Sequence, residues 1–522
     1  MQLGINFTIF NFIGQMSCFV ASTTVWFVLV LILVINVQHA KSMGATFIRS
    51  PIKAPPSVSI VGGGPAGLLT ALMLAQRGYD KVDVWEQLER PPSPDDAVAW
   101  ADSERSYNIG LNGRGQRALK RLNVMNRVAV HCVTVLGRLD WSPKSGAAKP
   151  TELIFQGKSY NTECIQRERL VATLLQEIEE KYGNKVKVHF ETVCSGVEWV
   201  QNAAERTEVC KLILRNSGGE EWIEESSFVV AAEGAGSATI REAMEKNPRG
   251  DFKVTRFEDK NIRVYKTIPL RLPAGSKKWR PELNFSARTG NDINLDALPT
   301  KEGFHLGVVL FRPGDERILN LKNGPDARAF FDECLPQFSP LIEDTDMETF
   351  AKKPISRLPR FSYSGPILNH GASTVLLGDA IHCVKPYFGQ GVNSAFEDVM
   401  VLDQCLDAAD DNLSIALPEY SVKRGPDARA LVEMSHKLDG GFVNFILPLI
   451  VDELLSKVAP KLFTKNVIAQ LQDERNTFAQ IQARKRIERV AQFTMVGALL
   501  AVVTRGVLSL SRLALRLVRL AV

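Results

Sequence analysis

Residues 57–86 read SVSIVGGGPAGLLTALMLAQRGYDKVDVWE, and this stretch decides the fold of the chain. A β-rich run from Ser57 to Val61 is followed by a glycine-rich turn, by an apolar run to about Arg77 with helical character, and by a second β-rich run from Val82 to Trp85. A strand, a helix and a second strand in this order form a βαβ unit. The sequence therefore predicts an α/β domain built on a parallel sheet.

The turn between the first strand and the helix carries glycines at the spacing GxGxxG. Gly62 permits the tight turn, Gly64 lets the backbone approach a pyrophosphate, and Gly67 allows the helix to pack closely on the strand. The amides at the start of the helix suit phosphate oxygens, and Glu86 at the end of the second strand suits ribose hydroxyls. The residues predicted to bind a dinucleotide are Gly62, Gly64, Pro65, Ala66, Gly67 and Glu86.

A second motif lies far downstream, in STVLLGDAIHCVKPYFGQGVNSAFEDVMVLDQCL, residues 373–406. It predicts a strand from Thr374 to Leu377, then Gly378 and Asp379, then a loop and a helix from about Val392. The glycine fingerprint alone fits either a nicotinamide or a flavin dinucleotide, so this motif has to decide between them. An acid at the end of a strand suits a polyol hydroxyl, and a glycine-flanked helix N-terminus suits an electron-rich ring edge or carbonyl.

Together with three further segments, these motifs resemble the flavin-dependent aromatic hydroxylases of the p-hydroxybenzoate hydroxylase fold, and among them the kynurenine 3-monooxygenases. The further segments are RSYNIGLNGRGQRALKRL from Arg105, CIQRERL with Arg167, and FVVAAEGAGSATIR, which has Glu233 where the family has the Asp of an Asp-Gly motif. The resemblance covers roughly Val58 to Ala430 and implies a Rossmann-type FAD-binding domain interleaved with an antiparallel-sheet substrate domain.

The resemblance also implies residue roles. Arg167 lies where the family has an arginine against the flavin, Asp379 contacts the ribityl chain, and the segment from Pro386 to Asn393 wraps the isoalloxazine. The further cofactor-binding residues implied are Arg105, Arg167, Glu233, Gly378, Asp379, Gly391, Val392 and Asn393. The residues implied to shape the reactive side of the flavin, and so to serve catalysis, are Pro386, Gly389, Gln390, Gly391 and Asn393.

Two departures from the family pattern bear on the substrate. Kynurenine 3-monooxygenases hold the carboxylate of an amino acid with an arginine and tyrosines. Arg138 is the counterpart of the arginine, but the tyrosines fall at Phe155 or Gln156 and near His436 or Leu438. A site that lacks these hydroxyls has lost donors that a carboxylate needs, so we expect a substrate other than kynurenine. The predicted substrate residues are Arg138, Phe155 and His436.

The implied activity is that of an FAD-dependent monooxygenase. In this family the flavin is reduced by NAD(P)H and captures O₂ as a C4a-hydroperoxide, which attacks an electron-rich aromatic ring, while the protein supplies position and dryness. Two alternatives remain open. The same fold also epoxidises or reduces isoprenoid lipids, and the chain is alternatively a flavin-binding membrane adaptor with little turnover.

The length of 522 residues predicts more than one domain, because single cores stop growing near roughly 250–300 residues. We expect the cofactor domain in two parts around a substrate domain. The expected segments are an anchor or targeting segment (1–40), a linker (41–56), the first part of the FAD-binding domain (57–245, with strands of the substrate sheet near 133–160), the substrate domain (246–356), the second FAD-binding part (357–430), C-terminal helices (431–489) and a membrane-associating helix (490–522).

The net charge of +5 lies at the ends of the chain. Residues 1–57 carry +3 and residues 484–522 carry +7, so the body between them is weakly acidic at −5. This distribution argues against a nucleic-acid-binding body and favours a membrane. The eight cysteines form no CxxC pair, which favours a reducing compartment and predicts no zinc or other metal site.

Both ends of the chain have membrane-seeking patterns. Cys18–Val37 is an uncharged apolar run long enough to span a bilayer, with a cleaved presequence as the alternative. Residues 490–522 read as a basic amphipathic helix, with docking on the body as the alternative. The positive-inside rule leaves the body cytoplasmic. The family resemblance implies the mitochondrial outer membrane, and a presequence would imply a plastid or an endomembrane.

Overall fold

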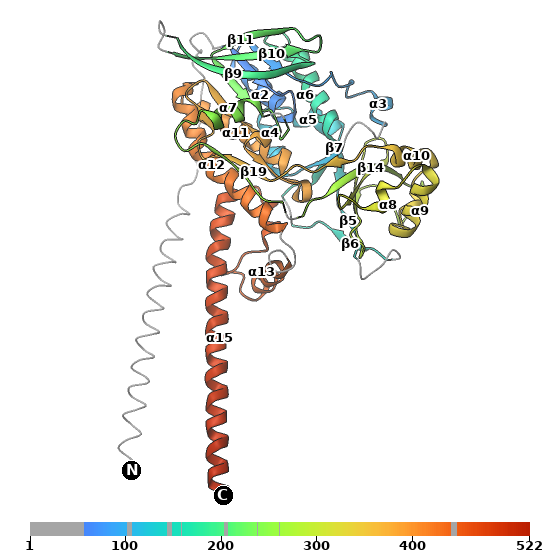
Figure 1. Ribbon diagram of the computed structural model, residues 1–522, viewed down its shortest axis with the longest axis vertical. Helices are drawn as coiled ribbons and strands as arrows, with labels where there is room; N and C mark the ends of the chain where they lie inside the picture. The colour runs from blue at the N-terminus through green and yellow to red at the C-terminus, as the bar shows by residue number, and fades with distance from the viewer. Residues whose placement is uncertain are drawn as a thin grey trace, which may run out of the picture. The chain divides into compact units, whose positions relative to one another are not determined.

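The computed structural model describes residues 57–101, 107–142, 149–157, 159–202, 207–236, 238–259, 261–439 and 446–521 (Figure 1). The chain separates into two units, Met1–Pro51 and Ile52–Val522, and every described element belongs to the second. The segments expected at residues 1–40 and 41–56 lie outside the described residues, as does the predicted cofactor residue Arg105.

The cofactor domain is built on a six-stranded sheet in the order β20-β21-β12-β1-β2-β8, in which all neighbours are parallel except β20 and β21. β1 consists of four buried residues, as expected for a central strand covered on both faces. The predicted βαβ unit is confirmed. The strands are β1 (Val58–Val61), β2 (Val82–Trp85), β8 (Val186–His189), β12 (Phe228–Ala231), β20 (Asn369–His370) and β21 (Thr374–Leu376).

Helices on this sheet come from segments that are distant in the sequence. α2 packs against α6 and α11, and α11 packs against α4 and α12, so residues after 390 share one core with the first βαβ unit. The helices of this domain are α2 (Pro65–Arg77), α3 (Ala97–Ala101), α4 (Gly113–Arg121), α5 (Met125–Val130), α6 (Arg167–Tyr182), α7 (Thr239–Lys246), α11 (Gly391–Ala408) and α12 (Leu413–Leu438), with short 3-10 turns η2 (Gly378–Ala380) and η3 (Pro386–Phe388).

Three small antiparallel sheets surround this core. The sheet β11-β10-β9 packs its inner residues, among them Cys210 and Leu212, into the core of the cofactor domain. The strands are β9 (Thr192–Asn202), β10 (Thr207–Asn216) and β11 (Glu221–Ser226); β13 (Lys253–Arg256), β19 (Ser362–Gly365) and β22 (His382–Cys383); and β3 (Asn108–Leu111), β4 (Val133–Val135) and β7 (Thr162–Gln166).

The second large sheet has seven strands in the order β18-β14-β17-β16-β15-β5-β6. It is antiparallel, as predicted, except that β5 and β15 are parallel. Its strands are β5 (Gly137–Trp141), β6 (Thr151–Ile154), β14 (Val264–Arg271), β15 (Leu283–Arg288), β16 (Asn294–Pro299), β17 (Phe304–Phe311) and β18 (Ser356–Arg357), and helices α8 (Glu316–Leu319), α9 (Gly324–Cys334), η1 (Ser339–Leu341) and α10 (Asp344–Lys352) follow β17.

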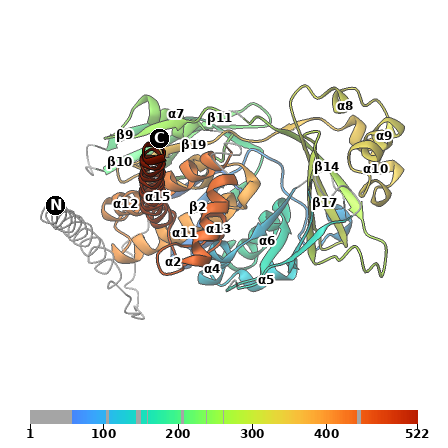
Figure 2. The same ribbon diagram turned by 90° about the horizontal axis from the view of Figure 1, so that it is seen from below.

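One face of this sheet forms a core of its own with these helices. Trp141 and Phe285 lie in an aromatic cluster with Phe338 of the helical segment. Figure 2 shows β14 and β17 between α8–α10 on one side and α6 of the cofactor domain on the other. The opposite face of the sheet, called the inner face below, therefore turns towards the cofactor domain.

The chain ends in α13 (Leu447–Val458), α14 (Val467–Leu471) and a single helix of 44 residues, α15 (Phe478–Ala521). α15 begins well before the expected boundary at residue 490. Its first turns pack against α12, and it then projects beyond the other elements (Figure 1). Among the described residues, Phe478–Arg505 is the one stretch of helix long and apolar enough to cross a membrane.

Candidate cofactor and substrate site

The predicted cofactor motifs meet at one edge of the six-stranded sheet. Val61 of β1 pairs with Ala231 of β12, and Ala231 pairs with Leu376 of β21. The three strands are parallel, so Gly62, Glu233 and Gly378 follow them on the same side of the sheet. This carboxyl edge is where open α/β sheets bind dinucleotides.

The glycine-rich loop leaves no space for side chains at two positions. Gly62 has φ +105°, and a Cβ there would lie 2.3 Å from the carbonyl oxygen of Ala232. A Cβ on Gly67 would lie 1.9 Å from the carbonyl oxygen of Gly62. At Gly64, where α2 begins, a Cβ would meet only Nη2 of Arg167, at 3.4 Å. The loop therefore packs closely on the sheet at Gly62 and Gly67, and it has space next to Arg167 at Gly64.

Glu86 lies against this loop rather than away from it. Its Oε2 accepts a hydrogen bond from the Gly63 amide at 2.6 Å, and its Oε1 accepts one from the Leu88 amide at 2.8 Å. The carboxylate thus joins the end of β2 to the glycine-rich turn. Pro65 occupies the first turn of α2, where the missing N–H costs no hydrogen bond.

Tyr107, Arg167 and Asp379 come from three separate segments and interact electrostatically. Burial raises the pKa of Tyr107 to about 12, yet 39% of its surface remains exposed. Burial also raises the pKa of Asp379, against the opposing effect of His382 and Arg167, and Asp379 too keeps accessible surface. Both residues are therefore surrounded by protein and still keep accessible surface. Gly378, at φ +64°, lies next to Ala66 of the glycine-rich loop, since a Cβ there would lie 3.5 Å from the Cβ of Ala66.

Glu233 is turned towards the N-terminus of α7. Its carboxylate accepts hydrogen bonds from the amides of Ile240, at 3.0 Å, and Arg241, at 3.3 Å, and so caps the N-terminus of α7. Burial raises the pKa of Glu233 to about 7, and the two amides oppose this rise. The additional methylene relative to aspartate gives the side chain the reach to act as a cap.

The loop before α11 separates into an open part and a buried part. Pro386 is exposed, Gly389 has φ +60°, and Gly391 at the start of α11 has open space around its Cα, with Val392 half-buried beside it. Gln390 and Asn393, in contrast, are buried.

The amides of Gln390 and Asn393 are satisfied by protein groups. Asn393 donates to the carbonyl oxygens of Gly110 and Gly389 and accepts from the Asn112 amide at 2.8 Å. Gln390 donates to the carbonyl oxygens of Phe388 and Leu471. These two side chains hold the loop on β3 and on the C-terminal helices.

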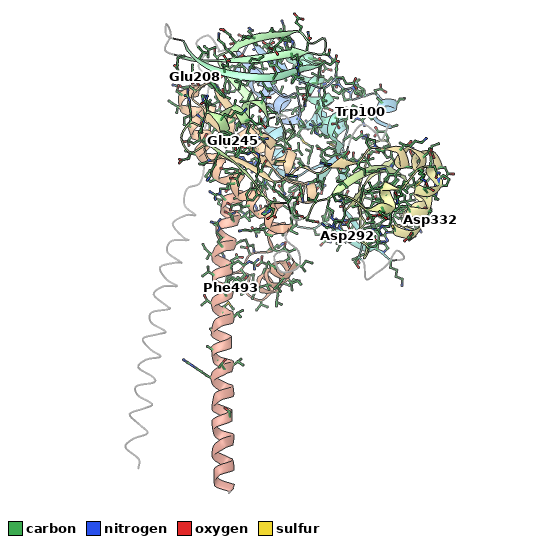
Figure 3. The ribbon with its side chains drawn as sticks, viewed as in Figure 1. Trp100, Glu208, Glu245, Asp292, Asp332 and Phe493 are labelled. Atoms are coloured by element: carbon green, nitrogen blue, oxygen red, sulfur yellow. The ribbon has the colours of Figure 1, made fainter. Side chains whose placement is uncertain are left out.

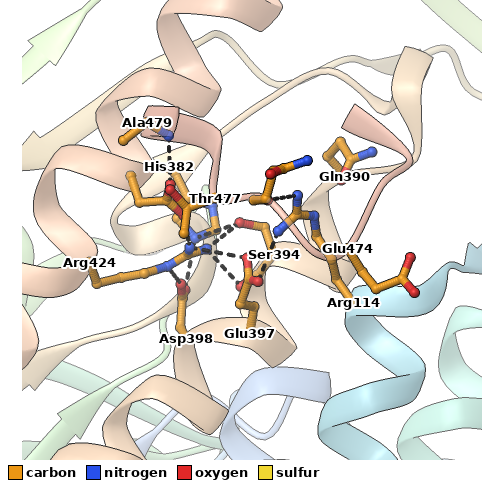
Figure 4. A network of polar contacts seen from close by, with 12 residues as sticks. Arg114, His382, Gln390, Ser394, Glu397, Asp398, Arg424, Glu474, Thr477 and Ala479 are labelled. Atoms are coloured by element: carbon orange, nitrogen blue, oxygen red, sulfur yellow. Dashed lines mark hydrogen bonds and ion pairs between the residues drawn. The ribbon is translucent and has the colours of Figure 1, made fainter. Parts of the chain in front are cut away.

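A buried polar network behind this loop was not foreseen from the sequence (Figure 4). Arg424 of α12 contacts Asp398, donates to Ser394 Oγ at 2.6 Å, and pairs with Glu397 at 3.2 Å and Asp427 at 2.5 Å. His382 shares Asp398, with 2.8 Å between Nε2 and Oδ2. A signal was available, since the acidic pair of the FED segment lies in a helix whose neighbours are apolar, and buried acids require a cation.

The same network connects the start of α15 to the loop. The Ala479 amide donates to Asp427 at 2.7 Å, and the guanidinium of Arg114 lies 4.2 Å from the centre of the Phe478 ring. Arg114 also pairs with Glu397 at 2.9 Å. The first turn of α15 is therefore part of the cofactor domain.

The three predicted substrate residues are not brought together by any contact among the described residues. Arg138 Nη2 pairs with Asp140 at 2.7 Å on the same strand. Phe155 follows the end of β6 and lines a small cavity of about 160 Å³ with Tyr160. His436 packs on Phe257 and Phe361, and its Nε2 lies 3.0 Å from the carbonyl oxygen of Glu258.

The register places Phe155 diagonally from Arg138 and not opposite it. In the antiparallel pair of β5 and β6, the residue opposite Arg138 is Leu153, two positions before Phe155. A larger cavity of about 890 Å³ lies between β9 and α7, and none of the predicted site residues lines it. The candidate site is therefore defined by the motif residues and not by this cavity.

Comparison with known proteins adds to this geometry. Residues 56–435 match the FAD binding domain family. The kynurenine 3-monooxygenase of Salinispora arenicola is 30% identical over 383 residues, which are 72% of this chain and 78% of that protein. The chain belongs to the FAD-dependent aromatic hydroxylases. Another similar relative, the kynurenine 3-monooxygenase of Sus scrofa, is 29% identical over 381 residues, 73% of this chain and 74% of that protein.

Solved structures of hydroxylases share the fold of this hydroxylase. The oxygenase of 2-methyl-3-hydroxypyridine-5-carboxylic acid superposes with a TM-score of 0.55 at 18% identity, covering 78% of this chain and 94% of that one. PqsL of Pseudomonas aeruginosa, in complex with 2-aminobenzoylacetate, superposes with a TM-score of 0.54 at 21% identity, covering 74% and 95%.

The residues of this hydroxylase fit FAD. Gly62 and Gly67 hold a loop that only glycine can form, the first amides of α2 have no helical acceptor, and Arg167 lies beside Gly64. Asp379 offers a carboxylate for hydroxyl groups, and the open start of α11 offers amides for a ring carbonyl. The chain is thus a flavoprotein and an oxidoreductase. The individual roles of its site residues are proposals, taken up next.

Proposed function

We propose that this hydroxylase uses NAD(P)H and O₂ to hydroxylate a small aromatic substrate. When bound, FAD would supply the oxygen chemistry, through the C4a-hydroperoxide that reduced flavin forms with O₂. The observation that supports the proposal most is that Tyr107, Arg167 and Asp379, which come from three separate segments, interact beside the glycine-rich loop. Tyr107 also interacts electrostatically with Tyr265 of the seven-stranded sheet.

The residues of the chain divide the work as follows. The loop from Gly62 to Gly67 and the start of α2 would bind the pyrophosphate, while Arg167 and Asp379 would hold the remainder of FAD. Pro386, Gly389, Gly391 and Val392 would lie against the ring, with Gln390 and Asn393 fixing the backbone between them. Glu86 and Glu233 would act indirectly, by holding the loop and α7.

The experiment that tests this proposal is a turnover measurement on the purified full chain in detergent. We expect a yellow protein that NADPH or NADH reduces without oxygen and whose NAD(P)H oxidation in air rises with aromatic compounds, giving a product one oxygen atom heavier. The same measurement with isoprenoids in place of aromatic compounds tests the alternative that the enzyme acts on a lipid. Colourless protein, or oxidation that no aromatic compound accelerates, would count against the proposal, and slow anaerobic reduction would favour an adaptor.

We also propose that the C-terminal helices attach the enzyme to a membrane. On α15, Val490, Phe493 and Val496 are exposed, and Phe493, labelled in Figure 3, is 76% exposed. On α13, Ile450 and Leu454 belong to a stripe of exposed apolar residues at helical spacing, Leu447, Ile450, Leu454 and Val458.

The opposite side of α13 is tied to α15. Asp452 is fully buried there and accepts from Arg489 at 2.9 Å and from Gln492 at 3.1 Å. The apolar stripe of α13 is therefore held beside the exposed part of α15. Later in α15, Arg505, Arg512, Arg516 and Arg519 lack acidic neighbours in the sequence, which suits anionic headgroups.

A further inference from the structure

The inner face of the seven-stranded sheet carries an ion pair at the position expected to bind a substrate carboxylate. Side chains at alternate positions of a strand share a face, so Arg138 and Asp140 point the same way, while Leu139 and Trp141 point into the core with α9 and η1. Arg138 Nη2 lies 2.7 Å from Asp140 Oδ2. The guanidinium is thus already neutralised by the chain itself.

The neighbouring strands add no unpaired cation on the part of the inner face that the structure describes there. β15 pairs with β5 in register, Asn284 with Arg138 and Ser286 with Asp140. Ser286 donates to Asp296 Oδ1 at 2.8 Å, and Arg288 pairs with the same carboxylate at 2.9 Å. Two arginines and two aspartates therefore cancel in charge across this area.

Two polar atoms on this face nevertheless lack partners among the described residues. They are Nε of Arg138, which is a donor, and Oδ1 of Asn284, which is an acceptor. The two residues are register neighbours on adjacent strands, which run about 4.8 Å apart, and their side chains share the face. A buried polar atom without a partner costs free energy unless a ligand or water satisfies it.

We propose that Asp140 makes the substrate of this enzyme a neutral aromatic compound with an amide-like donor and acceptor, and not a carboxylate or an amino acid. The carbonyl oxygen of such a group would accept from Arg138 Nε, and its N–H or O–H would donate to Asn284 Oδ1. A carboxylate would instead meet the acceptor of Asn284 and the charge of Asp140, and like charges in proximity oppose binding. This inference rests on the proposed function, because it assumes that the inner face binds the substrate.

The test uses three probes with one ring. The probes 2-aminobenzamide, 2-aminobenzoate and kynurenine share a 2-aminophenyl carbonyl group and differ in being neutral, anionic and zwitterionic. Binding to the FAD-loaded full chain is measured by calorimetry and by the change in flavin absorbance, without turnover. We expect 2-aminobenzamide to bind about tenfold or more tightly than either charged probe. Tighter binding of 2-aminobenzoate or kynurenine would overturn the inference.

Two substitutions then assign the preference to residues. We expect Asp140→Asn to strengthen 2-aminobenzoate binding about threefold to tenfold, because the substitution keeps a hydrogen bond to Arg138 and removes the charge. Asn284→Ala should weaken 2-aminobenzamide binding by a similar factor and should not weaken 2-aminobenzoate binding, because it removes an acceptor that the carboxylate would meet. The matched control is Asp344→Asn, which removes one negative charge from a side chain that is 96% exposed in the same domain.

The results separate this inference from the function. In one outcome the wild-type chain binds FAD and hydroxylates an aromatic compound while Asp140→Asn leaves the probe preference unchanged. This result refutes the inference and leaves the proposed function intact. An FAD-loaded chain that oxidises no NAD(P)H with any aromatic compound refutes the function, while the calorimetric comparison of the three probes still decides the charge preference. Asp344→Asn changing the preference as much as Asp140→Asn would also refute the inference, since net charge would then explain both.

Discussion

Glycine at position 67 is fixed by contact distance, and this makes it the most direct test of the cofactor site. A Cβ there would lie 1.9 Å from the carbonyl oxygen of Gly62, so α2 would have to move away from β1. We expect Gly67→Ala to abolish FAD retention, because the loop could no longer bring its amides to the pyrophosphate. The ratio of flavin to protein absorbance after purification measures this.

The matched control for Gly67→Ala is Gly290→Ala, where a Cβ would meet nothing within 4 Å and the backbone is not left-handed. This variant should retain FAD at the wild-type ratio. Thermal unfolding of both apoproteins separates cofactor loss from loss of the fold. Full FAD retention by Gly67→Ala would show that the loop does not bind the cofactor.

Because the carboxyl of Glu233 is buried, we expect the stability of the protein to depend on pH. Burial raises the pKa of the Glu233 carboxyl to about 7 in the folded protein, above its ordinary value of 4.5. A raised pKa means that the folded state binds the proton more tightly, so the contribution of Glu233 to stability is greatest below about pH 4.5 and is lost as the pH rises to about 7. In the wild type we expect Glu233 to lower the free energy of unfolding by on the order of 1–3 kcal/mol over this range. Glu233→Gln should abolish this decrease, so its plot of unfolding free energy against pH should be flatter.

The control for Glu233 is Glu242→Gln, which changes an exposed acid in the first turn of the same helix. It should leave the slope between pH 4.5 and pH 7 as it is in the wild type. Equal slopes for wild type and Glu233→Gln would contradict the account, and would mean that the amides of Ile240 and Arg241 outweigh burial.

Among the elements, α12 stabilises the loop before α11 through one buried arginine. Arg424 is 1% exposed and faces Glu397, Asp398 and Asp427, which are also buried. Removing a cation from buried acids leaves them uncompensated, at a cost of about 3–5 kcal/mol. We expect Arg424→Ala to lower the free energy of unfolding by this amount and to weaken FAD retention, as measured by urea unfolding followed through flavin release.

The same helix offers the control for Arg424. Arg429 is 63% exposed and pairs with Glu433 one turn away, and exposed pairs of this kind contribute about 0–1 kcal/mol. Arg429→Ala should therefore unfold at nearly the wild-type urea concentration. If the two arginine variants were equally stable, the network of Figure 4 would contribute little to the loop.

The elements also show how far sequence reasoning reaches. α2 ends at Arg77 as predicted, because its limits are local: a proline opens it and Gly78, at φ +100°, closes it. The parallel pairing of β5 with β15 was missed, because it joins segments about 140 residues apart and no local pattern encodes it. Each cofactor motif was predicted at the end of a strand for the same local reasons as α2, whereas their meeting at one edge depends on the pairing of β12 with β1 and β21.

The substrate site was predicted less completely. The residue type at 138 was identified by resemblance, but its partner Asp140 was overlooked although alternation along a strand places both on one face. Arg424 and the acids around it lie up to 27 residues apart in the sequence, and their meeting depends on how α11 packs on α12. Trp279, Phe285 and Phe304 of the same domain are all buried, as is usual for large aromatic side chains.

At the scale of the whole molecule, the distribution of charge and apolar surface predicts where the enzyme resides. The body is weakly acidic, and the exposed apolar residues of α13 and α15 lie next to one another. We expect a chain that lacks residues 1–51 to sediment with vesicles that contain anionic lipid, because the C-terminal helices alone should suffice. Binding should weaken as salt is raised, since arginines of α15 contribute to it.

The decisive comparison removes residues 496–522 from that shortened chain. The cut leaves Arg489 and Gln492 on Asp452, so the contact between α13 and α15 is preserved. We expect this variant to stay in the supernatant with its FAD, because an apolar stripe as short as that of α13 does not hold a protein of this size on a bilayer by itself. Retention of the variant on vesicles would place the attachment elsewhere in the body, and release of the chain that lacks only residues 1–51 would place it in the N-terminal segment.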